Sequence, residues 1–232
     1  MSKARYEKDR VKRRATIFFT LLLMGGRLAW SQGFVDLNFE NAQIIPLASS
    51  PYYPYGMATS NALPGWNASI GGSQVTEITY DDPALGSTWI NLCATNGTQL
   101  SGNYSVLLQG GLTASNASIS QTALVPGGAE AILFEAQGTG VGTLVVSLGG
   151  QNLSLFALSS GANYTLYGAN ISTFAGETEQ LTFSALGVSS GFNNWNIDDI
   201  QFSASTVPEP GVMGLLGLGG LLFGLCRWKN RR

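Results

Sequence analysis

The chain has 232 residues, which suits one domain of ordinary size together with targeting segments. Its twelve Lys and Arg residues lie near the two ends, so residues 28–226 contain no basic residue and no His. Eleven of the fourteen acidic residues remain in the body, residues 32–206, once Glu7, Asp9 and Glu209 are set aside. This charge excludes nucleic-acid binding and catalysis by a His base, a Lys nucleophile or an Arg phosphate clamp, and leaves groups that suit sugars and hard cations.

The first segment has the three parts of a secretory signal. A basic stretch ends at residues 12–14, an apolar run covers residues 15–26, and small residues stand at Ala29 and Ser31. We expect a signal peptide over residues 1–31 that is removed on export. An uncleaved anchor is the alternative, which Arg27 and the short apolar run disfavour.

The body shows the alternation typical of β-strands. Short runs with apolar residues at a spacing of two are separated by Gly, Asn, Ser and Pro, and Gly149 and Gly150 form a hairpin turn between two of them. The runs cover residues 34–39, 75–80, 104–108, 132–134, 144–148, 153–158, 164–167 and 181–183. The body is therefore predicted to be an all-β, antiparallel β-sandwich, jelly-roll-like in its architecture.

The segment from residue 44 to residue 66 holds Pro46, Pro51, Pro54 and Pro64, so it cannot form an interior strand. Long ordered loops often carry function, and exposed aromatic faces stack on the apolar C–H patches of pyranose rings. The predicted sugar-binding platform consists of Tyr52, Tyr53, Tyr55 and Trp66. Trp89 and Trp195 are further candidates, and core packing is the alternative for each Trp.

The last run of the body, Trp195–Phe202, contains a change of phase. Ile197 and Ile200 are three residues apart, so a β-bulge is expected near Asp198 and Asp199. Sequence neighbours on a strand face opposite sides, so neither this acidic pair nor the pair at residues 81–82 forms a catalytic couple by itself. A glycoside hydrolase or lyase that uses carboxylates only stays open as an alternative.

Three short stretches carry a resemblance to known modules. Residues 36–40 (Asp-Leu-Asn-Phe-Glu), residues 64–66 (Pro-Gly-Trp) and residues 197–200 (Ile-Asp-Asp-Ile) are similar to jelly-roll carbohydrate-binding and galactose-binding-like modules. In such modules an acidic residue on the first strand and one on the last can share a metal. The resemblance implies a Ca²⁺ site formed by Glu40 with Asp198 or Asp199.

The C-terminus has three elements in a fixed order. Val207, Pro208, Glu209 and Pro210 precede sixteen apolar or small residues, 211–226, which would form a marginal transmembrane helix of about 24 Å. A basic stop-transfer tail follows, with its charges at Arg227, Lys229, Arg231 and Arg232. The tail is expected on the cytoplasmic side of the membrane and the body on the far side.

This ordering resembles the PEP-CTERM sorting signal of exosortase substrates, a C-terminal motif that is also labelled as an ice-binding protein C-terminal domain. The resemblance implies a Gram-negative bacterium that makes extracellular polysaccharide, with an exosortase-type membrane protease that cuts near residues 208–210. A plain C-terminal anchor is the alternative.

The expected organisation is a signal peptide over residues 1–31, an extracytoplasmic β-sandwich over residues 32–206 and a sorting signal over residues 207–232. The expected function is that of an exported, non-catalytic cell-surface or extracellular-matrix protein associated with polysaccharide. A purely structural or adhesive protein is the other alternative, and the sequence names no sugar.

Overall fold

The structure is a computed structural model, and it describes residues 33–82, 87–94, 99–111 and 115–207. The expected signal peptide, the expected transmembrane helix over residues 211–226 and the basic tail all lie outside these ranges. Within the ranges, no helix is long and apolar enough to span a membrane.

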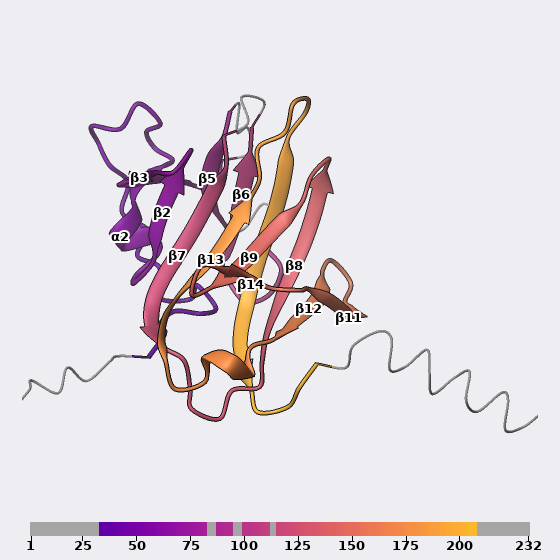
Figure 1. Cartoon of the computed structure of the whole chain (residues 1–232). Coiled ribbons are helices and arrows are strands. Elements are labelled where there is room, and N and C mark those ends of the chain that lie inside the picture. The colour runs from indigo at the N-terminus through magenta and orange to yellow at the C-terminus, as the bar shows by residue number, and fades with distance from the viewer. Residues whose placement is uncertain (1–32, 83–86, 95–98, 112–114, 208–232) are drawn as a thin grey trace, which may run out of the picture. The chain divides into compact units, whose positions relative to one another are not determined.

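The body is built from two β-sheets, which face each other as layers (Figure 1). The eight-stranded sheet contains, in spatial order, β1 (Gly56–Ala58), β4 (Glu77–Tyr80), β5 (Trp89–Cys93), β6 (Ser105–Gly110), β14 (Asn193–Ser203), β8 (Ala131–Gly140), β12 (Thr165–Asn170) and β11 (Phe156–Ser160). The six-stranded sheet contains β10 (Gln151–Asn152), β9 (Leu144–Leu148), β13 (Thr178–Ala185), β7 (Ala117–Leu124), β2 (Asn67–Ile70) and β3 (Ser73–Val75). The short helices are α2 (Thr59–Ala62) and η1 (Ser172–Phe174). The sequence prediction of an all-β body with predominantly antiparallel sheets is confirmed; among the described strand pairs, β4 and β5 run parallel.

Alternation places one face of each strand in the core. In the six-stranded sheet Phe183 lies opposite Ile119 on one side and Val146 on the other, and all three side chains are buried. In the eight-stranded sheet Ile197 lies between Val106 and Ala136 in the same way. These rows pack against each other because apolar side chains at a spacing of two share one face of a strand.

A line of ring contacts crosses the core. Consecutive ring centroids lie 5.1–6.4 Å apart, within the range in which aromatic pairs attract. The line runs through Trp195, Tyr167, Phe134, Phe183, Trp66 and Phe39. Because Phe134 belongs to β8 and Phe183 to β13, their edge-to-face contact joins the two sheets.

Two local predictions are confirmed. The register of β14 against β8 shifts between Asp198 and Gln201, and Asp199 has φ of 45°, which is the expected bulge. Gly149 and Gly150 both have positive φ in the hairpin between β9 and β10.

The strand expected over residues 34–39 is not formed. Gln121 of β7 pairs with the backbone of Val35, donating to its carbonyl at 3.0 Å and accepting from its N–H at 2.6 Å. Asp36 and Phe39 have positive φ, which a regular strand does not allow. Side chains from elsewhere in the fold therefore hold this segment as a turn.

The run expected over residues 75–80 is divided between the sheets. β3 ends at Val75 in the six-stranded sheet, and β4 begins at Glu77 in the eight-stranded sheet. The chain thus changes layers at Thr76, and one apolar run supplies both sheets.

Candidate functional site

The predicted tyrosines lie at the surface. Tyr52, Tyr53 and Tyr55 are 41%, 62% and 42% exposed, and the ring of Tyr52 lies 4.9 Å from that of Trp89. These rings are open to solvent, and they remain a predicted sugar platform.

Trp66, predicted as part of the sugar platform, belongs to the core, which was the alternative for each Trp. It is 4% exposed and contacts the rings of Phe39 and Phe183, and its indole N–H donates to the Asp36 carbonyl at 3.1 Å. A buried Trp whose N–H is paired in this way stabilises the fold and offers no face to a sugar.

The calcium site of Glu40 with Asp198 or Asp199 stays a prediction, and the structure shows which protein groups these acids bind. In the described part of the chain, no group of three or more His, Cys, Asp or Glu side chains could hold a metal. Glu40 accepts hydrogen bonds from the Asn103 side chain at 2.7 Å and from the backbone N–H groups of Asn103 and Tyr104. These bonds, against the opposing effect of burial, lower the pKa of Glu40.

Asp198 holds the same loop from the sheet side. Its carboxylate accepts from the backbone N–H of Ser101 at 3.0 Å and from the Ser101 hydroxyl at 3.2 Å, and its other oxygen accepts from the Asp199 N–H. The side chain is 1% exposed, and burial raises its pKa to about 7 although these bonds oppose the shift. Glu135 lies opposite it on β8, is 7% exposed, and has a buried oxygen, Oε2, with no hydrogen-bond partner.

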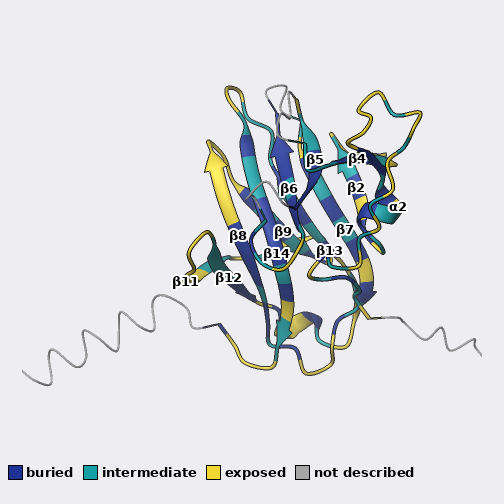
Figure 2. Cartoon of the chain, turned by 180° about the vertical axis from the view of Figure 1, so that it is seen from behind, coloured by how far each residue is buried: buried dark blue, intermediate teal, exposed yellow. Residues whose placement is uncertain are grey.

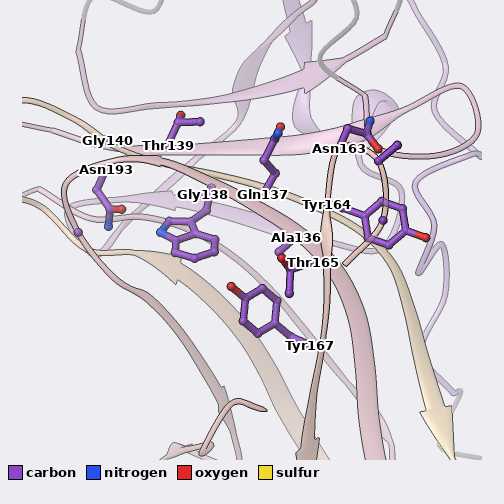
Figure 3. Close-up of a pocket in the computed structure, with 14 residues that line it drawn as sticks. Ala136, Gln137, Gly138, Thr139, Gly140, Asn163, Tyr164, Thr165, Tyr167 and Asn193 are labelled. Carbon is purple, nitrogen blue, oxygen red and sulfur yellow. The ribbon is translucent and has the colours of Figure 1, made fainter. Parts of the chain in front are cut away.

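A separate cavity of about 410 Å³ (Figure 3) opens beside the end of β8 that is coloured as exposed in Figure 2. It is lined by residues 136–140 of β8, by Gly142, by the turn at residues 161–165 between β11 and β12, and by Tyr167, Asn193 and Trp195. Asn193 lies at one end of the cavity, and Asn163 and Tyr164 lie at the other (Figure 3). We call this cavity the Trp195–Tyr167 pocket, and its volume falls within the usual range for ligand pockets.

Strand register brings the two rings of the pocket together. Tyr167 of β12 lies opposite Phe134 of β8, and Trp195 of β14 lies opposite Gly138 of the same strand. The ring centroids of Tyr167 and Trp195 are 6.2 Å apart with an interplanar angle of 70°. Both side chains are only half-buried, so they combine a fixed orientation with access from solvent.

Glycines make room for the aromatic rings. A Cβ atom at Gly138 would stand 2.8 Å from the ring of Trp195, and one at Gly161 would stand 2.6 Å from the ring of Tyr164. Any other residue at these two positions would displace the rings, so the ring positions depend on glycine, which has no side chain. The wall at Asn193 is fixed as well, because its amide nitrogen donates to the carbonyls of Thr143 and Leu186, both at 2.9 Å.

A second cavity of about 390 Å³ shares Gly142, Tyr167 and Trp195 with the first. Its remaining lining comes from residues 143–145 and from Asn152, Leu153 and Leu155. The aromatic pair therefore lines both a polar cavity and one with more apolar side chains.

Sequence reasoning found Trp195 but missed Tyr167. Tyr164 and Tyr167 are three residues apart, so they lie on opposite faces of a regular strand. Alternation alone does not show which of the two shares a face with Trp195. The two glycines at residues 138 and 140, in the polar stretch that follows an apolar run, were the available signal for a close approach of other groups.

The end of the body is held by a side-chain clamp. Asn170 of β12 accepts from the N–H of Val207 and donates to its carbonyl, and the Val207 side chain is buried over Gly168. From Thr206 onward, the sequence follows a known pattern: residues 206–232 match the family model of the PEP-CTERM protein-sorting motif. The chain carries a PEP-CTERM sorting motif.

This match confirms the resemblance predicted at the C-terminus. The PEP-CTERM motif implies export and exosortase-dependent sorting to the cell surface. Of the predicted motif residues, Val207 is described and docked on β12, whereas Pro208, Glu209, Pro210 and the basic residues 227, 229, 231 and 232 lie outside the described residues.

No curated protein matches the chain. Among solved structures, TmCBM61 in complex with beta-1,4-galactotriose is similar, with a TM-score of 0.41 and 16% sequence identity. That similarity covers 74% of this chain and 97% of the other.

Proposed function

We propose that this PEP-CTERM chain is an exported, non-catalytic protein of the cell surface or extracellular matrix, and that its body binds extracellular polysaccharide at the Trp195–Tyr167 pocket. The observation that carries the binding proposal is the pair of half-buried rings, held 6.2 Å apart over a strand glycine in a surface cavity.

The chemistry of the pocket supports a sugar. Aromatic faces stack on the apolar C–H patches of pyranose rings, while amide and hydroxyl groups pair with sugar hydroxyls. Asn163 and Thr165 supply such groups beside the rings, while Gln137 and Thr139 line the cavity from the face of β8 opposite to Trp195. Preformed walls add affinity, because little side-chain freedom is lost on binding.

The proposal also assigns a role to each segment of the chain. Residues 1–31 direct export, residues 32–206 form the extracytoplasmic body, and residues 211–226 anchor the chain until an exosortase-type protease cuts near residues 208–210. The residues that stop transfer are Arg227, Lys229, Arg231 and Arg232.

The alternative of a carboxylate-dependent glycoside hydrolase or lyase would require two accessible acids. Glu135 and Asp198 are the facing pair, yet both are more than nine-tenths buried, and neither lines the pocket or its neighbouring cavity. Acids this deeply buried offer little surface to a substrate, which favours the binding role.

A glycan array with the full-length chain, in a detergent without a sugar headgroup, tests this function. We expect glycan binding that Trp195→Ala abolishes. A variant with Tyr52, Tyr53 and Tyr55 all replaced by Ala serves as a matched control and should retain binding. Loss of binding in the control but not in Trp195→Ala would move the site to the tyrosine platform. Absence of binding by the wild type would favour the purely structural or adhesive role.

A further inference from the structure

We infer that the Trp195–Tyr167 pocket accepts a glycan without negative charge and rejects chains that carry carboxylate or sulfate groups. This inference rests on the proposed function and adds the substrate class. It follows from the charges around the pocket.

No cation can pair with an anionic sugar in the body. Residues 28–226 contain no Lys, Arg or His, so every fixed charge in the body is negative. Among the described residues that line the pocket, none is charged, and the polar side chains are amides, hydroxyls, two phenols and an indole. Sites that bind carboxylate or sulfate normally use Arg or Lys, whose charge-assisted hydrogen bonds offset the loss of water from the anion.

Two carboxylates act on the rim of the pocket. Glu135 forms a hydrogen bond with the phenol of Tyr164, and this bond and the charges of Glu135 and Asp199 raise the pKa of that phenol. Tyr164 lines the pocket, so a sugar anion there would meet the same negative field. Glu135 is also adjacent in sequence to Ala136, which lies in the pocket wall.

Two separate free-energy penalties therefore oppose the binding of anionic sugars. Such sugars would lose water without gaining a cationic partner, and they would be repelled by Glu135 and Asp199. The first effect is independent of salt, whereas the second weakens as the Debye length falls from about 30 Å at 0.01 M to about 3 Å at 1 M ionic strength. A neutral glycan meets neither penalty, so its binding should be insensitive to salt.

The test compares polymers that differ only in charge. A panel of neutral polysaccharides (α-glucan, β-glucan, galactan, mannan and xylan) and their carboxymethylated forms is titrated into the full-length chain and into Trp195→Ala, at about 0.01 M and about 1 M NaCl. We expect at least one neutral polymer to bind in a manner that depends on Trp195. Its carboxymethylated form should bind at least about tenfold more weakly at low salt, with the difference reduced at high salt.

A rim variant gives the converse result. Gln137 is exposed on the pocket rim, so Gln137→Lys should fold normally and supply the missing cation. It should bind the carboxymethylated form more tightly than the wild type does, while Gln137→Met should not.

The outcomes separate the two proposals. Equal or tighter binding of the carboxymethylated form by the wild type, with or without Ca²⁺ as a bridge, would overturn the charge selectivity and leave sugar binding intact. Binding of no polymer, or binding that Trp195→Ala does not change, would overturn the proposed function itself.

Discussion

The side-chain amide of Asn170 holds the backbone of Val207 from both sides: its Oδ1 accepts from the Val207 N–H at 2.7 Å, and its Nδ2 donates to the Val207 carbonyl at 3.3 Å. The hydroxyl of Ser203 accepts from the Ser205 N–H, which forms a tight turn just after β14. The residue that precedes Pro208 is thus part of the folded body. In this PEP-CTERM chain no free linker separates the last strand from the start of the sorting motif.

Replacement of the clamp should release this segment. In Asn170→Ala both hydrogen bonds to Val207 are lost, and at about 0.5–1.5 kcal/mol each the body should lose about 1–3 kcal/mol of unfolding free energy. The Val207 amide should then exchange its proton much faster, as hydrogen exchange would measure. Asn38→Ala, at an exposed position, is the matched control. Unchanged protection of Val207 in Asn170→Ala would contradict the clamp.

The pocket should be sensitive to a single methyl group at its floor. Gly138→Ala places a Cβ atom 2.8 Å from the Trp195 ring, so the ring must move, at a cost of about 1–3 kcal/mol. We expect a shifted Trp emission spectrum, weaker glycan binding and a lower melting temperature. Gly127→Ala, where nothing lies within 4 Å of the new methyl group, should change none of these properties. Identical behaviour of the two variants would show that Gly138 does not set the ring position.

The stability of the body should fall as pH rises from about 4 to about 7. Burial raises the pKa of Asp198 from 3.8 to about 7, so in this range the folded chain keeps a proton that the unfolded chain releases. The stabilising contribution is complete below the ordinary pKa of Asp198 and is lost as pH passes through the raised value. Burial raises the pKa of Asp36 too, which adds a slope of the same sign, whereas the lowered pKa of Glu40 adds the opposite slope at acidic pH.

Asp198→Asn isolates the contribution of that residue. Urea unfolding across the same pH range should give a much flatter profile for the variant, because its side chain does not titrate. The variant should be less stable than the wild type at the acidic end, since an amide cannot accept all three hydrogen bonds from Ser101 and Asp199. Parallel profiles for the two proteins would assign the slope to other groups.

The sorting motif should be required for processing. Replacement of Pro208, Glu209 and Pro210 by Ala should leave an unprocessed chain in the membrane fraction, whereas a chain that ends at Val207 should be exported in soluble form. Mass spectrometry of the membrane and extracellular fractions measures both results. A substituted chain that reaches the extracellular fraction with the wild-type mass would exclude a role for these three residues.

Local sequence patterns predicted the strands but not the partners that decide where each segment lies. The alternation in Leu144–Leu148 was sufficient to place β9, because residues 144, 146 and 148 form one continuous apolar face. The turn at Asp36 could not be predicted, because Gln121 and Trp66, which hold it, are distant in sequence. The same holds for the pocket, since Tyr167 meets Trp195 only through the register of β12 and β14 on β8.

The line of rings through the core also makes the body its own optical probe. Trp66 sits in an apolar, water-free setting and should emit at short wavelength, whereas Trp195 is half-buried at the pocket and should emit further to the red. Tyr167 is close enough to Trp195 for resonance energy transfer from the phenol to the indole, so light absorbed by this tyrosine contributes to emission from the pocket. A sugar over Trp195 should shift the red component, to which Trp89 also contributes, and leave that of Trp66 unchanged. Unfolding should shift both components, so one emission spectrum can follow occupancy and folding at the same time.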